Sequence, residues 1–164
     1  MVSLTITPTD AEFRREFDAT VAATVGSFVE TAANGGEPFP MLLVVAADGT
    51  RTIVGIPAML DCGTHGKRTS LVRDVGASFE DASAIYLSML AWSWRQAPGQ
   101  STENAKRGQR VEILIVYGMT RDRRSLFVSV DTGRSGEKIE PMTIGPVPDP
   151  VRTAEAALLE AFWA

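Results

Sequence analysis

The sequence predicts an α+β domain in which helices pack on a five-stranded, mostly antiparallel sheet. Two apolar segments with strand character each lead into a turn and a return strand, one around Asp48-Gly49 and one around residues 119–124. A capped amphipathic segment precedes the first hairpin, and a second helical segment separates the two. The predicted order is helix, two strands, helix, three strands, helix, in a chain whose 164 residues suit one domain.

Composition and charge narrow the class of protein. A hydrophobic content of 45% and a charged content of 22% are ordinary for a soluble globular domain. The net charge of −4 disfavours nucleic acid as a general partner. Cys62 and His65 are the single cysteine and the single histidine, which excludes an internal disulfide and a cysteine-rich or histidine-rich metal site. We expect a cytoplasmic protein without a signal peptide, a membrane span or a cofactor.

The first helix has the clearest start and end signals. Thr9 and Glu12 form a capping-box pattern, and Asn34-Gly35-Gly36 supplies a stop. Between these signals, apolar residues recur at four-residue spacing and predict a buried stripe. The stripe consists of Phe13, Phe17, Val21, Val25 and Val29, with Phe28 beside it. Residues 1–8 are predicted to form an N-terminal arm.

The next segment predicts a hairpin. Residues 41–47 are apolar on both faces, which indicates a strand covered on both sides. Asp48-Gly49 predicts a type I′ turn with positive φ at both positions. Residues 51–56 return, and Pro57 ends that strand or places it at a sheet edge.

A second helix is predicted from Lys67, after a loop over residues 58–66, with apolar residues at 71, 75 and 79. Residues 81–95 allow two interpretations. Aromatic and β-branched content favours a strand with Tyr86, Leu90, Trp92 and Trp94 on one face, whereas a capping-box pattern at residues 78–81 favours a helix. We prefer the strand.

The second half is predicted to hold the main hairpin and the last helix. Residues 96–110 form a long polar loop, and residues 111–131 form the hairpin with the strongest strand signal. Residues 132–149 form a connector that contains proline and glycine. Asp149-Pro150 then caps a last helix over Val151 to Trp163. We expect the first two helices to cover one side of the sheet and the last helix the other.

Two resemblances follow from these elements. The element order is similar to the roadblock and longin-like arrangement, which is a likeness of topology and carries no motif. The segments Pro40 to Gly49, Ala91-Trp92 and Arg110-Val111-Glu112 resemble uncharacterised small bacterial and phage proteins, over roughly residues 40 to 131. In that group an acidic residue commonly precedes the Ala-Trp pair, where this chain has Leu90. The resemblance implies no activity.

Asp61, Cys62 and His65 form one candidate catalytic group, because a cysteine nucleophile needs a base and an orienting residue within reach. Their location in one short glycine-rich loop makes chance proximity the favoured interpretation. Nucleotide-binding glycine motifs are absent, and one histidine excludes metalloisopeptidases of the JAB type, which need two.

Arg121, Arg123 and Arg124 form a candidate binding group at the tip of the main hairpin. Clustered arginines bind phosphate or carboxylate groups, and Lys106, Arg107 and Arg110 would enlarge the group if they lay nearby. The favoured alternative is a solvated tip whose charges prevent edge-to-edge aggregation.

The three tryptophans are the remaining candidates. Trp92 and Trp94 would line a groove or an interface, although a core position is favoured. Trp163 lies at the end of the last helix and needs a docking surface.

These observations predict a non-catalytic protein–protein interaction or assembly module. We expect a homodimer, with its contact near Trp163. The alternatives are a small enzyme that uses the Cys62 and His65 loop, and a nucleic-acid-associated protein that uses the arginine tip.

Overall fold

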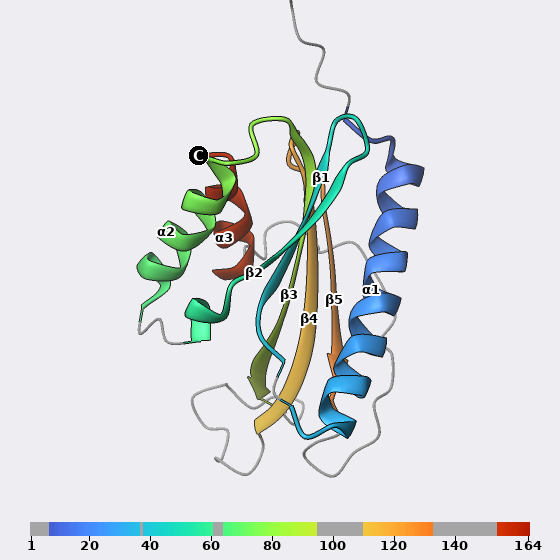
Figure 1. The fold of residues 1–164 in the computed structure, drawn as a ribbon, viewed down its shortest axis with the longest axis vertical. Coiled ribbons are helices and arrows are strands. Elements are labelled where there is room, and N and C mark those ends of the chain that lie inside the picture. Colours follow the sequence, from blue (N-terminus) through green and yellow to red (C-terminus); the bar gives the residue numbers. More distant parts are fainter. Residues whose placement is uncertain (1–6, 37, 61–63, 95–109, 133–153) are drawn as a thin grey trace, which may run out of the picture.

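The computed structural model describes residues 7–36, 38–60, 64–94, 110–132 and 154–164 (Figure 1). Five antiparallel strands form one sheet in the order β2-β1-β3-β4-β5, which confirms the predicted α+β class and element order. The elements are α1 (Asp10–Ala33), β1 (Met41–Ala46), β2 (Arg51–Gly55), the short 3₁₀ helix η1 (Pro57–Leu60), α2 (His65–Gly76), β3 (Ala82–Trp94), β4 (Arg110–Thr120), β5 (Ser125–Asp131) and α3 (Ala154–Phe162).

The helices form two layers, one on each face of the sheet (Figure 1). α1 packs alone on one face, while α2 and α3 pack against each other on the opposite face. The expectation that the first two helices share a face is therefore wrong. α2 follows β2 through η1, and both helices of the second layer bury their apolar side chains against the same side of the central strands.

α1 begins and ends where the sequence predicts. The Thr9 amide donates to the Glu12 carboxylate at 2.9 Å, and the Glu12 amide donates to the Thr9 hydroxyl at 3.2 Å, which completes the capping box. At the other end Asn34 is the C-cap residue, and Gly35 follows with φ of 75°. Glycine adopts this conformation without a Cβ clash, so the helix ends there.

The buried face of α1 matches the predicted stripe except at its last position. Phe13, Phe17, Val21 and Phe28 are buried, whereas Val29 is 48% exposed. Residues four apart advance by about 40° around a helix of 3.6 residues per turn, so the stripe drifts off the sheet face by its fifth member. Phe28 takes the inward position in that turn.

The β1–β2 hairpin has a different turn from the predicted type I′. Gly49 has φ of 87°, and Asp48 has no positive φ. The Gly49 amide donates to the Ala46 carbonyl at 2.9 Å, and the Ala46 amide donates to the Thr50 carbonyl at 2.8 Å. This is the pattern of a type I turn closed by a glycine bulge. The Asp48 carboxylate accepts from Thr50, which lowers the pKa of Asp48 and strengthens the turn at neutral pH.

β3 is the central strand of the sheet, so the strand interpretation of residues 81–95 is confirmed and the helix alternative is wrong. It pairs with β1 on one side and with β4 along its length on the other. Alternate residues enter two cores, as predicted: Tyr86 packs beneath α1, while Ile85 and Leu87 pack beneath α2 and α3. Long-range pairing on both edges overrides the local helix signal.

α2 and α3 approach each other closely at Gly76. A Cβ atom at this position would lie 1.8 Å from the Phe162 carbonyl oxygen, so only glycine permits the contact. α2 begins at His65, capped by Thr64, rather than at Lys67, and it ends at Gly76. Leu158 and Phe162 of α3 are buried. The predicted cap at Asp149-Pro150 lies outside the described residues. So do residues 96–109 of the predicted polar loop and residues 133–149 of the predicted connector.

Candidate protein interaction surface

The loop with the candidate catalytic cysteine is only partly described. Asp61 and Cys62 lie outside the described residues, and the side chain of His65 is also outside the description. His65 is the first residue of α2, where the Thr64 hydroxyl accepts from the Lys67 amide at 3.3 Å. The cysteine–histidine hypothesis therefore stays a prediction from the sequence.

Arg121 and Arg123 at the hairpin tip have partners within the fold. The Arg121 guanidinium donates to the Glu80 carbonyl at 2.7 Å and to the Ala82 carbonyl at 3.3 Å. The Arg123 guanidinium lies 5.0 Å from the centre of the Trp163 ring, a cation–π distance. These contacts connect the tip to the start of β3 and to the end of α3.

Arg124 points to a third part of the molecule. Its guanidinium pairs with Asp122 at 3.1 Å, forms an ion pair with Asp10 and donates to the Pro8 carbonyl. It therefore holds the start of α1 against the β4–β5 turn. The three arginines face three different sets of partners, and this arrangement favours a structural role for each. Their predicted anion-binding role stays untested.

Arg110 does not join the arginine tip. It is the first residue of β4, whose last residue adjoins the tip. Ten residues at about 3.3 Å each separate them by roughly 33 Å. The predicted enlargement of the basic group by Arg110 is therefore wrong, while Lys106 and Arg107 lie outside the described residues.

The tryptophans occupy two different parts of the fold. Trp92 and Trp94 lie in β3, opposite Glu112 and Arg110 of β4, and their side chains lie outside the description. Trp163 is partly buried, packs against the core of the α2–α3 layer and contacts the Phe162 ring edge-on at 5.2 Å. Trp163 thus has partners within its own chain, and the predicted dimer contact near it stays untested.

On the α1 side, the described helices cover β1 and β2 only in part. α1 contacts β3, β4 and β5, so the outer two strands extend beyond it on that face. Leu42 and Val44 of β1 are buried under the other layer, whereas Met41, Leu43 and Val45 face the α1 side and are only partly buried. The prediction that both faces of this strand are covered therefore holds for the α2–α3 side and only in part for the α1 side.

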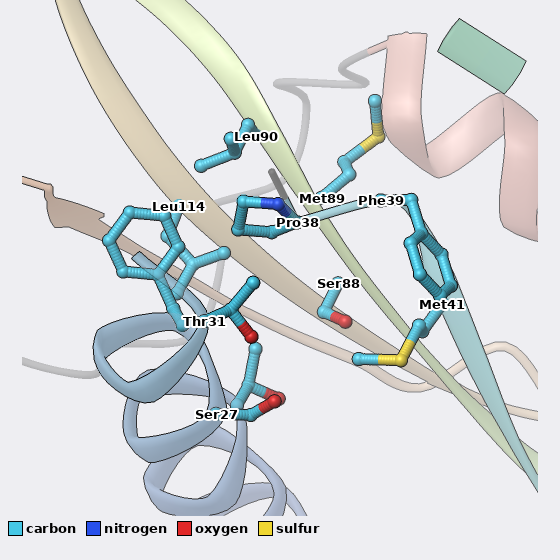
Figure 2. A pocket seen from close by; sticks show the side chains of 11 residues that line it. Ser27, Thr31, Pro38, Phe39, Met41, Ser88, Met89, Leu90 and Leu114 are labelled. Atoms are coloured by element: carbon cyan, nitrogen blue, oxygen red, sulfur yellow. The ribbon is translucent and has the colours of Figure 1, made fainter. Parts of the chain in front are cut away.

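A groove runs between α1 and the face of β1 and β2 on the α1 side. Its larger part has a volume of about 400 Å³, and an adjoining hollow of about 190 Å³ continues it toward the end of α1 (Figure 2). Both parts share Thr24, Ser27, Met41 and Ser88. The other residues of the larger part are Ala19, Thr20, Ala23, Leu43, Arg51, Ile53 and Tyr86.

The adjoining hollow has apolar walls with a few hydroxyl groups. In Figure 2, Ser27 and Thr31 project from α1 toward Pro38, and Met41 and Ser88 line the sheet side. Among the residues that the structure describes, its lining contains no charged side chain. A surface of this kind suits apolar groups that also make a few hydrogen bonds.

Among the described lining residues of the larger part, Arg51 is the single charged one. Arg51 of β2 reaches across to Glu16 of α1, with a nitrogen–oxygen distance of 2.6 Å. Burial, and then the Glu16 carboxylate, raise the pKa of the Tyr86 phenol on the groove floor, so this phenol stays neutral at physiological pH. A neutral phenol and a neutralised arginine give the groove little net charge.

Two large apolar side chains stand out at the rim of this surface. Ile53 of β2 is 71% exposed, and Phe39 is 45% exposed. Phe39 lies over Gly55, where an added Cβ would be 2.8 Å from its ring. We call Phe39, Met41, Leu43 and Ile53 with the facing residues of α1 the β1–β2 surface.

None of the residues that define the β1–β2 surface was among the candidate site residues predicted from the sequence. The available signal was the short strand ending at Pro57, which indicates an edge strand. The exposure of Ile53, in the middle of this strand, becomes evident only when the position of α1 on the sheet is known.

Other site types lack support in the described part of the chain. No group of three or more histidine, cysteine, aspartate or glutamate residues is placed there to bind a metal ion. Within the same ranges, no helix combines the length and apolar character needed to cross a membrane.

Comparison with known proteins adds no relative. No protein-family model matches the chain, and searches of curated proteins and of solved structures find no match. The resemblances in topology and sequence segments therefore stay predictions.

Proposed function

We propose that the protein is a non-catalytic protein–protein interaction module that binds its partner through the β1–β2 surface. The observation that carries this proposal is the exposure of Ile53 and Phe39 next to an apolar groove at the edge of the sheet. Exposed apolar side chains are common singly, but a cluster beside a groove is typical of an interaction site. The surface also has the low charge of an interface core.

The arrangement of the helices explains why the surface is present. α1 covers three of the five strands, and its side toward β2 carries the small residues Ala19, Ala23 and Ser27. Small side chains there leave room for groups of another molecule above Leu43. Longer residues at these positions would fill the groove from within the chain.

The test is affinity purification of the tagged protein from cells that normally make it, after mild cross-linking. The parent chain is compared with Ile53→Lys, which places a charge in the β1–β2 surface, and with Val29→Lys. Val29 is also a large exposed apolar residue, but it lies outside the groove lining, so it is a matched control.

We expect a stoichiometric partner, either another copy or another protein, with the parent and with Val29→Lys. The Ile53→Lys variant should lose it while its circular dichroism spectrum stays unchanged. A parent chain that purifies without any stoichiometric partner, or a partner retained by Ile53→Lys, would contradict the proposal.

A further inference from the structure

Among the described residues β2 is an edge strand, and its outer edge has backbone groups that do not bond to β1. The Ile56 amide donates to the Pro40 carbonyl, and the Ala46 amide donates to the Thr50 carbonyl, both at 2.8 Å. Hydrogen-bonded pairs alternate along an antiparallel ladder, so the even-numbered residues of β2 bond to β1. The odd-numbered residues point their amides and carbonyls outward. These residues are Arg51, Ile53 and Gly55.

The residues of β2 itself lack the usual features that prevent strand pairing. Natural edge strands are protected by proline, a bulge or a charged side chain. Within β2 there is no proline, its register with β1 is continuous, and its single charged residue is Arg51. The Arg51 guanidinium is drawn back across the sheet to Glu16. The edge therefore presents Ile53 at its centre and no outward charge.

We infer that the partner of the β1–β2 surface is a second copy of this chain, bound by antiparallel pairing of β2 with β2. The inference rests on the proposed function and specifies its partner. A two-fold axis at Ile53 places each Ile53 opposite its equivalent and each Arg51 opposite Gly55 of the other copy. The three outward residues of each strand then form hydrogen-bonded pairs, and the two arginines stay at opposite ends.

The exposed apolar side chains support this register. Gly55 has no side chain of its own, and the Phe39 ring occupies the space above it. In the paired strands Gly55 is the diagonal neighbour of Ile53 of the other copy, and diagonal neighbours lie within reach of an aromatic side chain. Phe39 and Ile53 of both copies would thus form one apolar row across the axis.

Pairing in this register joins the five strands of each copy into one continuous sheet. The axis is perpendicular to the sheet, so both α1 helices lie on the same face, and the two grooves meet above the new pair of strands. A five-residue strand gives a short contact, at the low end of interface sizes, below about 1,200 Å². We therefore expect a dimer that dissociates on dilution.

The first experiment measures mass by light scattering from about 1 to about 200 micromolar protein. The parent should change from the 17.6 kDa monomer toward twice that mass as concentration rises. Ile53→Lys should weaken the association at least tenfold, because it places two positive charges side by side at the axis. Val29→Lys should leave it unchanged.

The second experiment tests the register by disulfide trapping. The background is Cys62→Ser, which removes the single native thiol. Ile53→Cys should form a linked dimer on mild oxidation, since residues of a hydrogen-bonded pair have Cα atoms about 5.5 Å apart, within disulfide range. Thr50→Cys is the control, because the two Thr50 residues would lie roughly 20 Å apart in this register.

A parent that stays monomeric over the whole range, with no linkage through Ile53→Cys, would overturn the second-copy inference. So would a dimer that links through Thr50→Cys as readily as through Ile53→Cys. Neither result removes the proposed function if the purification recovers a different protein that Ile53→Lys loses. A missing partner in that purification, together with a parent that stays monomeric in light scattering, would remove both.

Discussion

Phe17→Ala tests how firmly α1 is held against the sheet. The Phe17 ring is fully buried and lies 6.5 Å from the Tyr86 ring, with the two planes tilted. Both rings pack over Gly118 of β4, where an added Cβ would be about 3.0 Å from each of them. α1, β3 and β4 meet at this point, and the absence of a side chain at Gly118 makes room for the two rings. The surrounding residues therefore have little freedom to move into the cavity that removal of the Phe17 ring would leave.

We expect Phe17→Ala to lower the free energy of unfolding by about 3–5 kcal/mol, the range for a buried phenylalanine. This is a large part of a typical total of about 5–15 kcal/mol. Urea unfolding followed by circular dichroism measures the change. With a slope of about 2 kcal/mol per molar urea, the midpoint should fall by roughly 1.5–2.5 M.

Val29→Ala is the matched control in the same helix. Val29 is 48% exposed, and alanine has the higher helix propensity. The free energy of unfolding of Val29→Ala should therefore differ from that of the parent by no more than about 0.5 kcal/mol, as is usual for surface changes. A Phe17→Ala loss of less than about 1 kcal/mol would refute the packing argument, because it would mean that α1 adjusts or that its contact with the sheet contributes little.

Three further predictions concern other parts of the molecule. Gly76→Ala should lower the free energy of unfolding by about 1–3 kcal/mol, because the added Cβ clashes with the Phe162 carbonyl. Gly66→Ala in the same helix has open space around the added Cβ and should be neutral or slightly stabilising. Thermal unfolding of both variants measures the difference. Hydrogen bonds from the Thr120 hydroxyl, which has the larger effect, and from Arg124 lower the pKa of the Asp122 carboxylate. The stability that the ionised Asp122 contributes is therefore complete above the unfolded-state pKa of about 3.9 and disappears as pH falls through the lower folded-state pKa. Asp122 is half exposed, so the acid-dependent loss should be about 1 kcal/mol or less and absent in Asp122→Asn; equal acid sensitivity of both chains would count against it. Cys62 should be alkylated as an ordinary thiol, and an apparent pKa well below the reference value of about 8.5 in the pH dependence of this reaction would support the enzyme alternative.

Local signals in the sequence determined several elements correctly. The Thr9 and Glu12 box predicted the start of α1, because the capping groups lie within four residues of each other. The two hairpins were also predicted, because apolar strand segments and the turns between them are properties of short segments. A strand over residues 81–95 was harder to predict, because the local capping-box pattern favours a helix. Pairing with β1 and β4 decides in favour of the strand.

The layer arrangement was decided by tertiary structure alone. An apolar strand such as β1 indicates burial but does not say which helix covers which face, and the main contacts of α1 with the sheet are with β3, β4 and β5. The exposure of Ile53 follows from that position of α1, and the close approach at Gly76 follows from the docking of α3. Each depends on groups far apart in the chain, whose relative positions are set by packing of the whole core and not by any short-range pattern.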